Sequence, residues 1–452
     1  MNRTKSLVLA VVVALTVLSG AGAYALTQTD DAGGQSDQTP ALAANWLSDT
    51  GRNITGNHHV AVGGQVGNRS LVFAPISGAA PSGGGHDHDH RDAASDESSA
   101  ASDAAAGCGL VALDGASGAA RWSYEVPAEN CTIHAIADPT LADLNGDGTR
   151  EVLATSTEKT VAAFDPATGE RSFEHNLSAY GYTRPLVANF TGDGDPEVVV
   201  VDVHGTVFVV EPDGETVWTR KLPANYVWGQ PHVEDFDGDG TSELAVALGS
   251  GRLVMLENDG TVAWNRSVGA GDSVTWFATG QADNDSPAEL VTATSGGNVS
   301  LFEGDGSLVW RRSLGAYAAV DAVGDGDDDG TPEVYATARD GDLRAIDATD
   351  GSVEWSTSLT TVNAQMTPPP VLGDVDGDGD DELVAASNGG KVATVDPKSG
   401  EILAEYERDT PIWTNPTLGD VDDDPAPEIL VMYGDGRVAA LSYGDGATQK
   451  SA

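Results

Sequence analysis

The sequence predicts an all-β fold, an eight-bladed β-propeller built from four-stranded antiparallel blades. The first observation is a nine-residue, Asp-rich loop that recurs seven times, about every 46 residues, a period long enough for one four-stranded sheet. The second is that alternating apolar and polar residues, joined by Asp-Gly or Ser-Gly turns, fill the segments between these loops. The third is that the two ends of the chain carry complementary parts of one blade.

The acidic loops have the composition of a calcium site. In the copy DFDGDGTSE, which begins at Asp235, acids occupy positions 1, 3, 5 and 9, and the glycine at position 6 allows a sharp turn. With the backbone carbonyl at position 7, these groups are the oxygen ligands that a hard cation such as Ca²⁺ binds. The copies from Asn189, Gln281 and Asp420 depart from the pattern at one or more positions. We expect Ca²⁺ as a structural cofactor in several blades, with acidic surface turns as the alternative. The predicted ligands are Asp143, Asn145, Asp147, Thr149, Glu151, Asp193, Glu197, Asp235, Asp237, Asp239, Thr241, Glu243, Asp283, Asp285, Glu289, Asp325, Asp327, Asp329, Thr331, Glu333, Asp374, Asp376, Asp378, Asp380, Glu382, Asp420, Asp422, Asp424 and Glu428.

One blade at each end of the series is atypical. The first begins at His58, lacks the acidic loop and resumes after an insertion. The eighth begins at Asn415 and lacks its fourth strand. Residues 43–49 match the outer strand of other blades, with Trp46 in the place of Trp218. We expect this segment to pair with the last blade and close the ring, which removes the exposed edges of an open array.

Two sets of aromatic residues occupy different places in the repeat. The first set lies in the outer strands, where packing between neighbouring blades is expected; it comprises Trp122, Trp218, Trp264, Trp310 and Trp355. The second lies in the connections between blades, on the face that the strand order places opposite the acidic loops. There it forms a candidate face for a partner, with burial between blades as the alternative. This second set comprises Tyr182, Trp228, Trp276, Tyr317 and Trp413.

The first blade carries both cysteines and the insertion. Cys108 and Cys131 map to the face of the blade connections, so we expect a disulfide between them in an exported protein, with two unpaired thiols as the alternative. The insertion at residues 78–107 has a composition typical of a disordered, solvated loop. Histidines within it alternate with aspartates, a pattern able to bind Zn²⁺, Cu²⁺ or Ni²⁺. These histidines are His86, His88 and His90.

The N-terminal segment predicts export. Residues 1–27 combine basic residues, an apolar run and the sequence AYA at residues 23–25, a site for a signal peptidase. The segment can serve as a cleaved signal peptide, or as a membrane anchor through residues 6–26, which are just long enough to span a bilayer. Residues 28–42 form a polar linker and residues 43–452 the propeller. We expect a monomer at the extracellular surface.

The chain is strongly acidic. Its 70 acidic and 23 basic residues give a net charge of −47, which argues against nucleic acid as a partner because the phosphate backbone is also anionic. Molar salt screens the self-repulsion of such a surface, so we expect a halophilic, haloarchaeal source.

Two known repeat families share these motifs. The D-x-D-G-D-G-x-x-E loops resemble the calcium-binding repeats of the FG-GAP and VCBS families. The stretches that contain A-x-D-x-x-x-G-x-x-x-W, such as VALDGASGAARW from Val111, resemble the repeat of the eight-bladed pyrroloquinoline quinone (PQQ) dehydrogenases. The second resemblance implies the propeller fold, and that family also includes a scaffold for assembly at the bacterial outer membrane. Its enzymes carry an adjacent pair of cysteines at the cofactor, whereas Cys108 and Cys131 are 23 positions apart.

The motifs of hydrolases and nucleotide-binding enzymes are missing from the sequence. There is no G-x-S-x-G elbow, no H-E-x-x-H pair and no phosphate-binding loop. We therefore expect a binding or scaffold module for a surface protein, a glycan or another envelope component, without PQQ. The alternative is a quinone- or metal-dependent extracellular oxidoreductase.

Overall fold

The computed structural model describes residues 40–48, 56–78, 107–269, 271–283, 285, 287–360, 366–422, 424 and 426–444. The chain divides into two units, Met1–Gln38 and Thr39–Ala452, and the fold below is that of the second. Three predicted features lie outside the described residues: the leader or anchor, nearly all of the linker, and the insertion with His86, His88 and His90. In the described part of the chain, no helix has the length and apolar character needed to cross a bilayer.

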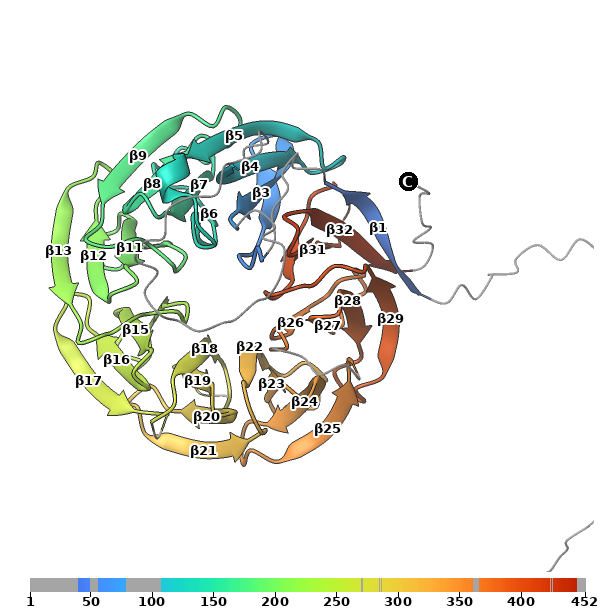
Figure 1. Cartoon of the computed structure of the whole chain (residues 1–452). Helices are drawn as coiled ribbons and strands as arrows, with labels where there is room; N and C mark the ends of the chain where they lie inside the picture. Colours follow the sequence, from blue (N-terminus) through green and yellow to red (C-terminus); the bar gives the residue numbers. More distant parts are fainter. Residues whose placement is uncertain are drawn as a thin grey trace, which may run out of the picture. The chain divides into compact units, whose positions relative to one another are not determined.

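Eight four-stranded antiparallel sheets follow one another around a ring, so the predicted all-β, eight-bladed propeller is confirmed (Figure 1). Blades one to four contain β2 (Val62–Val66), β3 (Arg69–Ile76), β4 (Cys108–Asp114) and β5 (Ala120–Val126); β6 (Thr140–Ala142), β7 (Glu151–Thr155), β8 (Thr160–Phe164) and β9 (Arg171–Asn176); β10 (Leu186–Ala188), β11 (Glu197–Val201), β12 (Thr206–Val210) and β13 (Thr216–Lys221); and β14 (His232–Glu234), β15 (Glu243–Leu248), β16 (Arg252–Leu256) and β17 (Val262–Ser267).

The remaining blades repeat the same arrangement. A short 3₁₀ turn, η1 (Ala128–Asn130), lies in the connection from β5 of blade one to β6 of blade two. Blades five to eight contain β18 (Val274–Gly280), β19 (Glu289–Thr294), β20 (Asn298–Phe302) and β21 (Leu308–Ser313); β22 (Ala319–Gly324), β23 (Glu333–Thr337), β24 (Asp342–Asp347) and β25 (Val353–Ser358); β26 (Val371–Gly373), β27 (Glu382–Ala386), β28 (Lys391–Val395) and β29 (Ile402–Glu407); and β30 (Thr417–Gly419), β31 (Glu428–Met432), β32 (Val438–Gly444) and β1 (Ala41–Leu47).

The burial of each strand follows from its place in the blade. The second and third strands lie between neighbouring blades, and β11 and β12 are buried along their whole length. Strands buried on both faces have continuous apolar sequences, as in EVVVV and TVFVV. The outer strand β13 alternates exposed and half-buried residues instead. Hydrophobic clusters join adjacent blades, for example Val199 and Val201 of blade three with Leu244 and Val246 of blade four.

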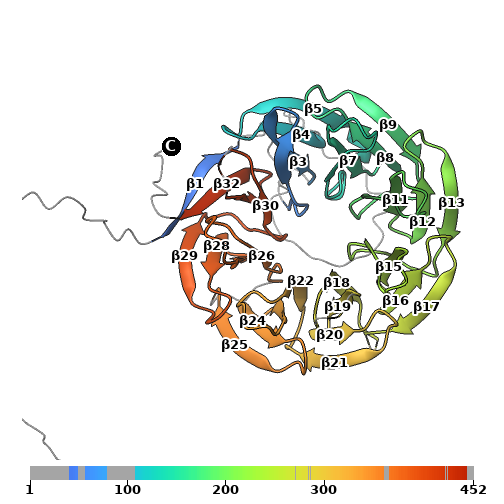
Figure 2. The ribbon, with the colours of Figure 1, turned by 180° about the vertical axis from the view of Figure 1, so that it is seen from behind.

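The N-terminal strand closes the ring, as predicted. β1 pairs antiparallel with β32, from Ala41 opposite Gly444 to Leu47 opposite Ala439, and it forms the outer edge of the last blade (Figure 2). The predicted boundaries, residues 43–49, are wrong by two residues. The strand begins earlier because Leu42 is buried and continues the apolar pattern toward the N-terminus.

Six tryptophans join successive blades through the same contact. Each indole Nε1–H donates to a backbone carbonyl in the turn between the third and fourth strands of the next blade. The pairs are Trp46 with Gly115 (2.6 Å), Trp122 with Pro166 (2.8 Å), Trp218 with Asn258 (2.9 Å), Trp264 with Gly304 (2.9 Å), Trp310 with Ala348 (2.6 Å) and Trp355 with Pro397 (2.7 Å).

Each of these rings also lies against a glycine of that turn. Gly118 has a φ of 66°, and a Cβ placed there would lie 2.4 Å from Cε3 of Trp46. The turn therefore requires glycine for its backbone conformation and for the close approach of the ring.

Candidate functional site

The antiparallel strand order gives the ring two faces with different chemistry. The loops between the first and second strands share one face with the turns between the third and fourth strands, and we call it the acidic-loop face. The other face, the connection face, holds the turns between the second and third strands and the connections between blades. Backbone hydrogen bonds fix several connections to the next blade, as from Thr157 N–H to Ala135 O (3.0 Å) and from Gly249 N–H to Tyr226 O (2.9 Å).

The acidic loop of blade four shows how the backbone shapes the predicted calcium site. Asp235 accepts the N–H groups of Gly238 (2.7 Å) and Gly240 (3.0 Å), and Asp239 accepts both the N–H and the hydroxyl of Thr241 (2.8 and 2.6 Å). One carboxylate oxygen from each of Asp235, Asp237 and Asp239 lies within 4.8 Å of the other two. The loop therefore gathers three acids around one point, where their mutual repulsion favours a bound cation.

The glutamate at position 9 is buried in all seven loops. One of its oxygens accepts the backbone N–H at position 2 of the same loop, so this residue holds the loop closed as well as facing the aspartates. The bonds are Leu144 to Glu151 (2.9 Å), Phe190 to Glu197 (2.7 Å), Phe236 to Glu243 (2.8 Å), Ala282 to Glu289 (2.6 Å), Gly326 to Glu333 (3.3 Å), Val375 to Glu382 (3.1 Å) and Val421 to Glu428 (2.9 Å).

Burial has an electrostatic cost for these glutamates. It raises the pKa of Glu243, Glu289 and Glu333 to about 7, and the neighbouring aspartates add to the shift. Oε1 of Glu333 is buried and has no hydrogen-bond partner. A buried carboxylate oxygen in this position is a free acceptor for a cation.

The loops of blades three, five and six also bring carboxylates together. In blade five the group is Asp283, Asp285 and Glu289, and in blade six it is Asp325, Asp327 and Glu333. In blade three, Asp193 and Glu197 are joined by Glu211 from the turn between the third and fourth strands, a residue absent from the predicted ligands. The sequence alone could have identified Glu211 as a candidate ligand, because the equivalent position is acidic in blades two to seven. Those residues are Asp165, Glu211, Glu257, Glu303, Asp347 and Asp396.

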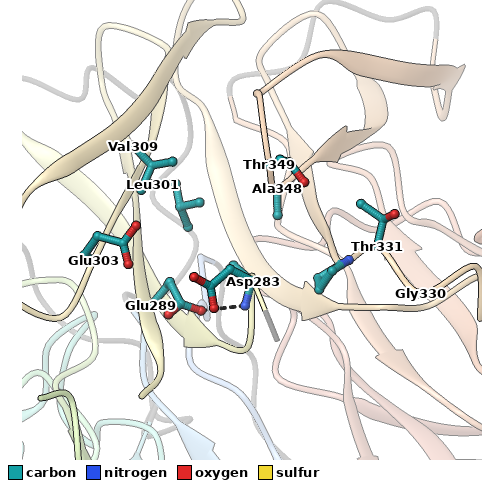
Figure 3. Close-up of a pocket in the computed structure, with 11 residues that line it drawn as sticks. Asp283, Glu289, Leu301, Glu303, Val309, Gly330, Thr331, Ala348 and Thr349 are labelled. Atoms are coloured by element: carbon teal, nitrogen blue, oxygen red, sulfur yellow. Dashed lines mark hydrogen bonds between the residues drawn. The ribbon is translucent and has the colours of Figure 1, made fainter. Parts of the chain in front are cut away.

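A pocket lies between the acidic loops of blades five and six, with a volume of about 370 Å³. Asp283, Glu289 and Glu303 line one side, and Thr331 and Thr349 face them from the next blade (Figure 3). Carboxylates and hydroxyls are oxygen ligands, so the lining suits a cation and disfavours an anionic ligand.

The predicted aromatic set is distributed around the connection face. Trp228 stacks on Tyr226 with ring centroids 4.0 Å apart. Trp413 is half-buried, and its Nε1 has no hydrogen-bond partner. Tyr317 is 41% exposed, lies 5.8 Å from the guanidinium of Arg339 and has a φ of 49°. A left-handed backbone is strained for a bulky side chain, so this exposed tyrosine is held in place by its surroundings.

The predicted position of Trp276 in a connection between blades is wrong. This residue belongs to β18 and sits at a register shift in the pairing with β19. Its half-buried ring packs against the hydrophobic cluster that joins blades five and six. The reason is local, since VTWFATG is a continuous β-type run that extends the first strand of this blade toward the connection.

Tyr182 has a different environment, which the sequence analysis missed. Its ring packs against His134 (centroids 4.9 Å apart), His59 (5.4 Å) and His58 (6.5 Å). Burial raises the pKa of the Tyr182 phenol well above its usual value. The repeat pattern gave no signal for these histidines because they precede β2 and β6, at positions where other blades carry different residues.

The two cysteines lie beside this cluster. Cys108 at the start of β4 and Cys131 after η1 are joined in a disulfide with Cα atoms 5.3 Å apart, the pair that the sequence analysis expected to be joined. The bridge ties the connection that carries His134 to the body of blade one.

Comparison with known proteins places the fold among described families. The family model PQQ_2, described as outer membrane protein assembly factor BamB, matches residues 82–193, 157–328 and 286–451. BamB from Moraxella catarrhalis is similar in structure, with a TM-score of 0.53 and 18% identity over 74% of this chain and 91% of that chain. The V. cholerae biofilm matrix protein Bap1 gives a TM-score of 0.65 and 14% identity over 90% and 91%.

An enzyme shares the architecture as well. The quinohemoprotein alcohol dehydrogenase ADHIIG from Pseudomonas putida HK5 gives a TM-score of 0.59 and 13% identity over 91% of this chain and 77% of that chain. No curated protein matches the sequence. At these identities the solved structures show the fold alone, whereas the three family matches together span residues 82–451. The chain therefore belongs to the PQQ_2 family of BamB-like repeat proteins.

Proposed function

We propose that this chain is an exported propeller that binds a surface protein or glycan through its connection face and carries out no chemistry there. The observation that carries the proposal is Tyr317, an exposed aromatic residue held at a strained backbone conformation. Strain of this kind costs roughly 1–3 kcal/mol and persists where the surrounding structure imposes it. Exposed aromatic side chains on rigid supports are typical anchors of binding surfaces.

The surroundings of Tyr317 support a rigid binding surface. Its own N–H donates to Ser295 O (3.0 Å), and the N–H of Arg339 donates to Ala316 O (3.0 Å), so backbone bonds hold the connection on both sides. Trp228 and Trp413 occupy connections of other blades that are fixed in the same way. A rigid surface loses little conformational entropy when a partner binds.

Calcium on the opposite face is proposed as a structural cofactor, in the manner of FG-GAP and VCBS loops. In blade four, Asp235, Asp237 and Asp239 would hold the ion, and Glu243 would close the loop behind it. The convergence of these carboxylates and the unpaired Oε1 of Glu333 in blade six support this role. A bound cation offsets the repulsion among the acids and thereby stabilises each loop in its folded form.

Export to the cell surface is proposed from the predicted leader, the disulfide and the family match to an outer membrane assembly factor. Residues 6–26 would anchor the chain if they are not cleaved. The acidic composition supports a high-salt environment, so functional assays belong in molar KCl.

The test is binding by the full chain to envelope components of its source organism. A partner captured by the wild-type protein is purified, and its affinity is measured for Tyr317→Ala, Trp228→Ala and the control Leu308→Ala. Leu308 is 50% exposed but lies on an outer strand, away from the connection face. We expect losses of roughly 30-fold or more for an aromatic anchor and no loss for the control.

Two results would overturn the binding function. The first is equal affinity in all variants whose circular dichroism and melting temperature match the wild type. The second is reduction of an electron-accepting dye by the purified protein in the presence of PQQ or a metal, which would favour the oxidoreductase alternative.

A further inference from the structure

The connection face carries a cluster of three histidines, His58, His59 and His134, contributed by segments 75 residues apart in sequence. One ring nitrogen from each lies within 4.8 Å of the other two. Nε2 of His58 and Nδ1 of His134 are 3.0 Å apart. Two nitrogens that share a tetrahedral Zn²⁺ at about 2.0–2.1 Å lie roughly 3.4 Å from each other. The pair is therefore close to the separation that one metal ion requires.

The hydrogen bonds of the cluster determine which nitrogens of His58 and His59 carry protons. A carbonyl and a carboxylate only accept, so Nδ1 of His58 carries a proton that it donates to Gly56 O (2.9 Å), and Nδ1 of His59 donates to Asp138 (3.1 Å). In the neutral imidazole, Nε2 of each ring is then the acceptor nitrogen, and that of His58 is hydrogen-bonded to Nδ1 of His134, where a metal ion would replace the shared proton. Metal-binding histidines are commonly oriented by a carboxylate or carbonyl on their other nitrogen in this way.

The burial of His59 is a second observation, separate from the clustering of the three rings, that points to a ligand. The residue is 2% exposed, and its Nε2 is buried without a hydrogen-bond partner. A buried acceptor left unpaired costs about 1–3 kcal/mol, and that cost is removed when the lone pair binds a metal ion. His58 and His134 are only half-buried, so the cluster has a closed base at His59 and an open side for entry.

The backbone around the cluster is held in place before any ligand arrives. Asp138 accepts the N–H of Val60 (2.8 Å) as well as His59, and Gln230 donates to its other oxygen. The disulfide holds Cys131 three residues before His134, and Ile136 N–H donates to Ser77 Oγ (2.9 Å) just after it. Binding would therefore need side-chain adjustment and little movement of the main chain.

The donor set selects the class of metal. Three neutral imidazoles suit borderline ions such as Zn²⁺, Cu²⁺ and Ni²⁺, whereas Ca²⁺ and Mg²⁺ require oxygen ligands. We propose that His58, His59 and His134 form a metal site for a borderline divalent cation, with Zn²⁺ as the representative ion and the fourth position open toward solvent. The site lies on the face opposite the acidic loops and is separate from the proposed calcium sites.

The experiment measures Zn²⁺ binding to the full chain by calorimetric titration in excess Ca²⁺, which keeps the acidic loops occupied. The background carries His86→Ala, His88→Ala and His90→Ala, so that the insertion histidines do not contribute. Tetrahedral Co²⁺ absorption then reports the geometry. We expect one tight site, whose affinity falls about 10–100-fold in Asp138→Asn, as for other residues that orient a metal-binding histidine.

Variants of the ligands decide the proposal. His134→Ala and His58→Gln change half-buried side chains and should lose the tight site and the Co²⁺ spectrum. His204→Ala, an exposed histidine in a turn on the same face, should keep both. The proposal is overturned if the metal-free wild-type protein shows no tight Zn²⁺ site. It is also overturned if folded His134→Ala and His58→Gln bind as tightly as the wild type.

Discussion

Trp46 should contribute more to stability than any other residue of the N-terminal strand. Its side chain is 8% exposed, donates to Gly115 O and lies against Gly118 of the neighbouring blade. Replacement by alanine removes a buried ring and leaves a cavity, at a cost of about 3–5 kcal/mol. Replacement by phenylalanine keeps most of the volume but leaves the carbonyl of Gly115 unpaired, at a cost of about 1–3 kcal/mol.

The expected shift in melting temperature follows from the size of the ring. An unfolding entropy of about 2.1 cal/mol/K per residue, over roughly 400 residues, gives about 0.8 kcal/mol/K, so 4 kcal/mol lowers the melting temperature by about 5 °C. Scanning calorimetry of the full chain, at fixed KCl and Ca²⁺, measures this shift directly.

Leu47 provides the matched control because it is the next residue of the same strand and is 42% exposed. Leu47→Ala should change stability by no more than about 0.5 kcal/mol. If Trp46→Ala and Leu47→Ala melt at the same temperature, the tryptophan does not hold the last blade against the first, and the account of ring closure is incorrect.

Three further predictions concern calcium, pH and the disulfide. Chelation of Ca²⁺ should lower the melting temperature, since a site held at a hundredfold excess of Ca²⁺ over Kd contributes about 2.7 kcal/mol. Asp239→Ala should reduce the difference in melting temperature between calcium-loaded and chelated protein, whereas Asp409→Ala on the other face should not. An unchanged difference in Asp239→Ala would contradict calcium binding in blade four. Glu243, Glu289 and Glu333 have folded-state pKa values of about 7, above their ordinary value of 4.5, so the calcium-free folded protein binds more protons than the unfolded chain between these values. The stability of the calcium-free protein should therefore fall as pH rises from about 5 to 7, and it should fall less steeply in Glu243→Gln. A calcium-free melting temperature that does not change over this range would contradict the conclusion that burial raises the pKa of these glutamates. Mass spectrometry should find alkylated cysteines only after reduction, and Cys131→Ser should lower stability by roughly 3 kcal/mol, whereas alkylation of the unreduced protein would rule the bridge out.

The sequence was most informative where a feature repeats. Seven loops and a recurring outer-strand tryptophan define the blades, and the match of Trp46 to Trp218 predicted closure before any pairing was known. The edges of elements are harder to predict, because the sequence around Leu42 fits both a polar linker and a strand, and only the burial of its side chain shows that it belongs to the strand. Trp276 was misplaced for a related reason, since its strand is longer than the first strand of most blades.

The histidine cluster lay beyond the reach of the sequence. His58 and His59 are adjacent in the chain and precede β2, and nothing in the repeat links them to His134. Only the placement of the two connections side by side brings the three rings together. The oxygen atoms of Gly56 and Asp138 then determine which nitrogen of His58 and of His59 carries the proton.

The pairing of β1 with β32 also governs the order in which the molecule can fold. Blades one to seven are each made from a continuous or nearly continuous stretch of chain, so they can form while later residues are still being synthesised. The last blade needs Ala41 and Gly444 at the same time. Contacts so distant in sequence form slowly, because the loop-closure entropy must be overcome before they contribute. Until that step, both ends of the ring expose strand edges, so the protein should be most vulnerable to aggregation and proteolysis immediately before closure.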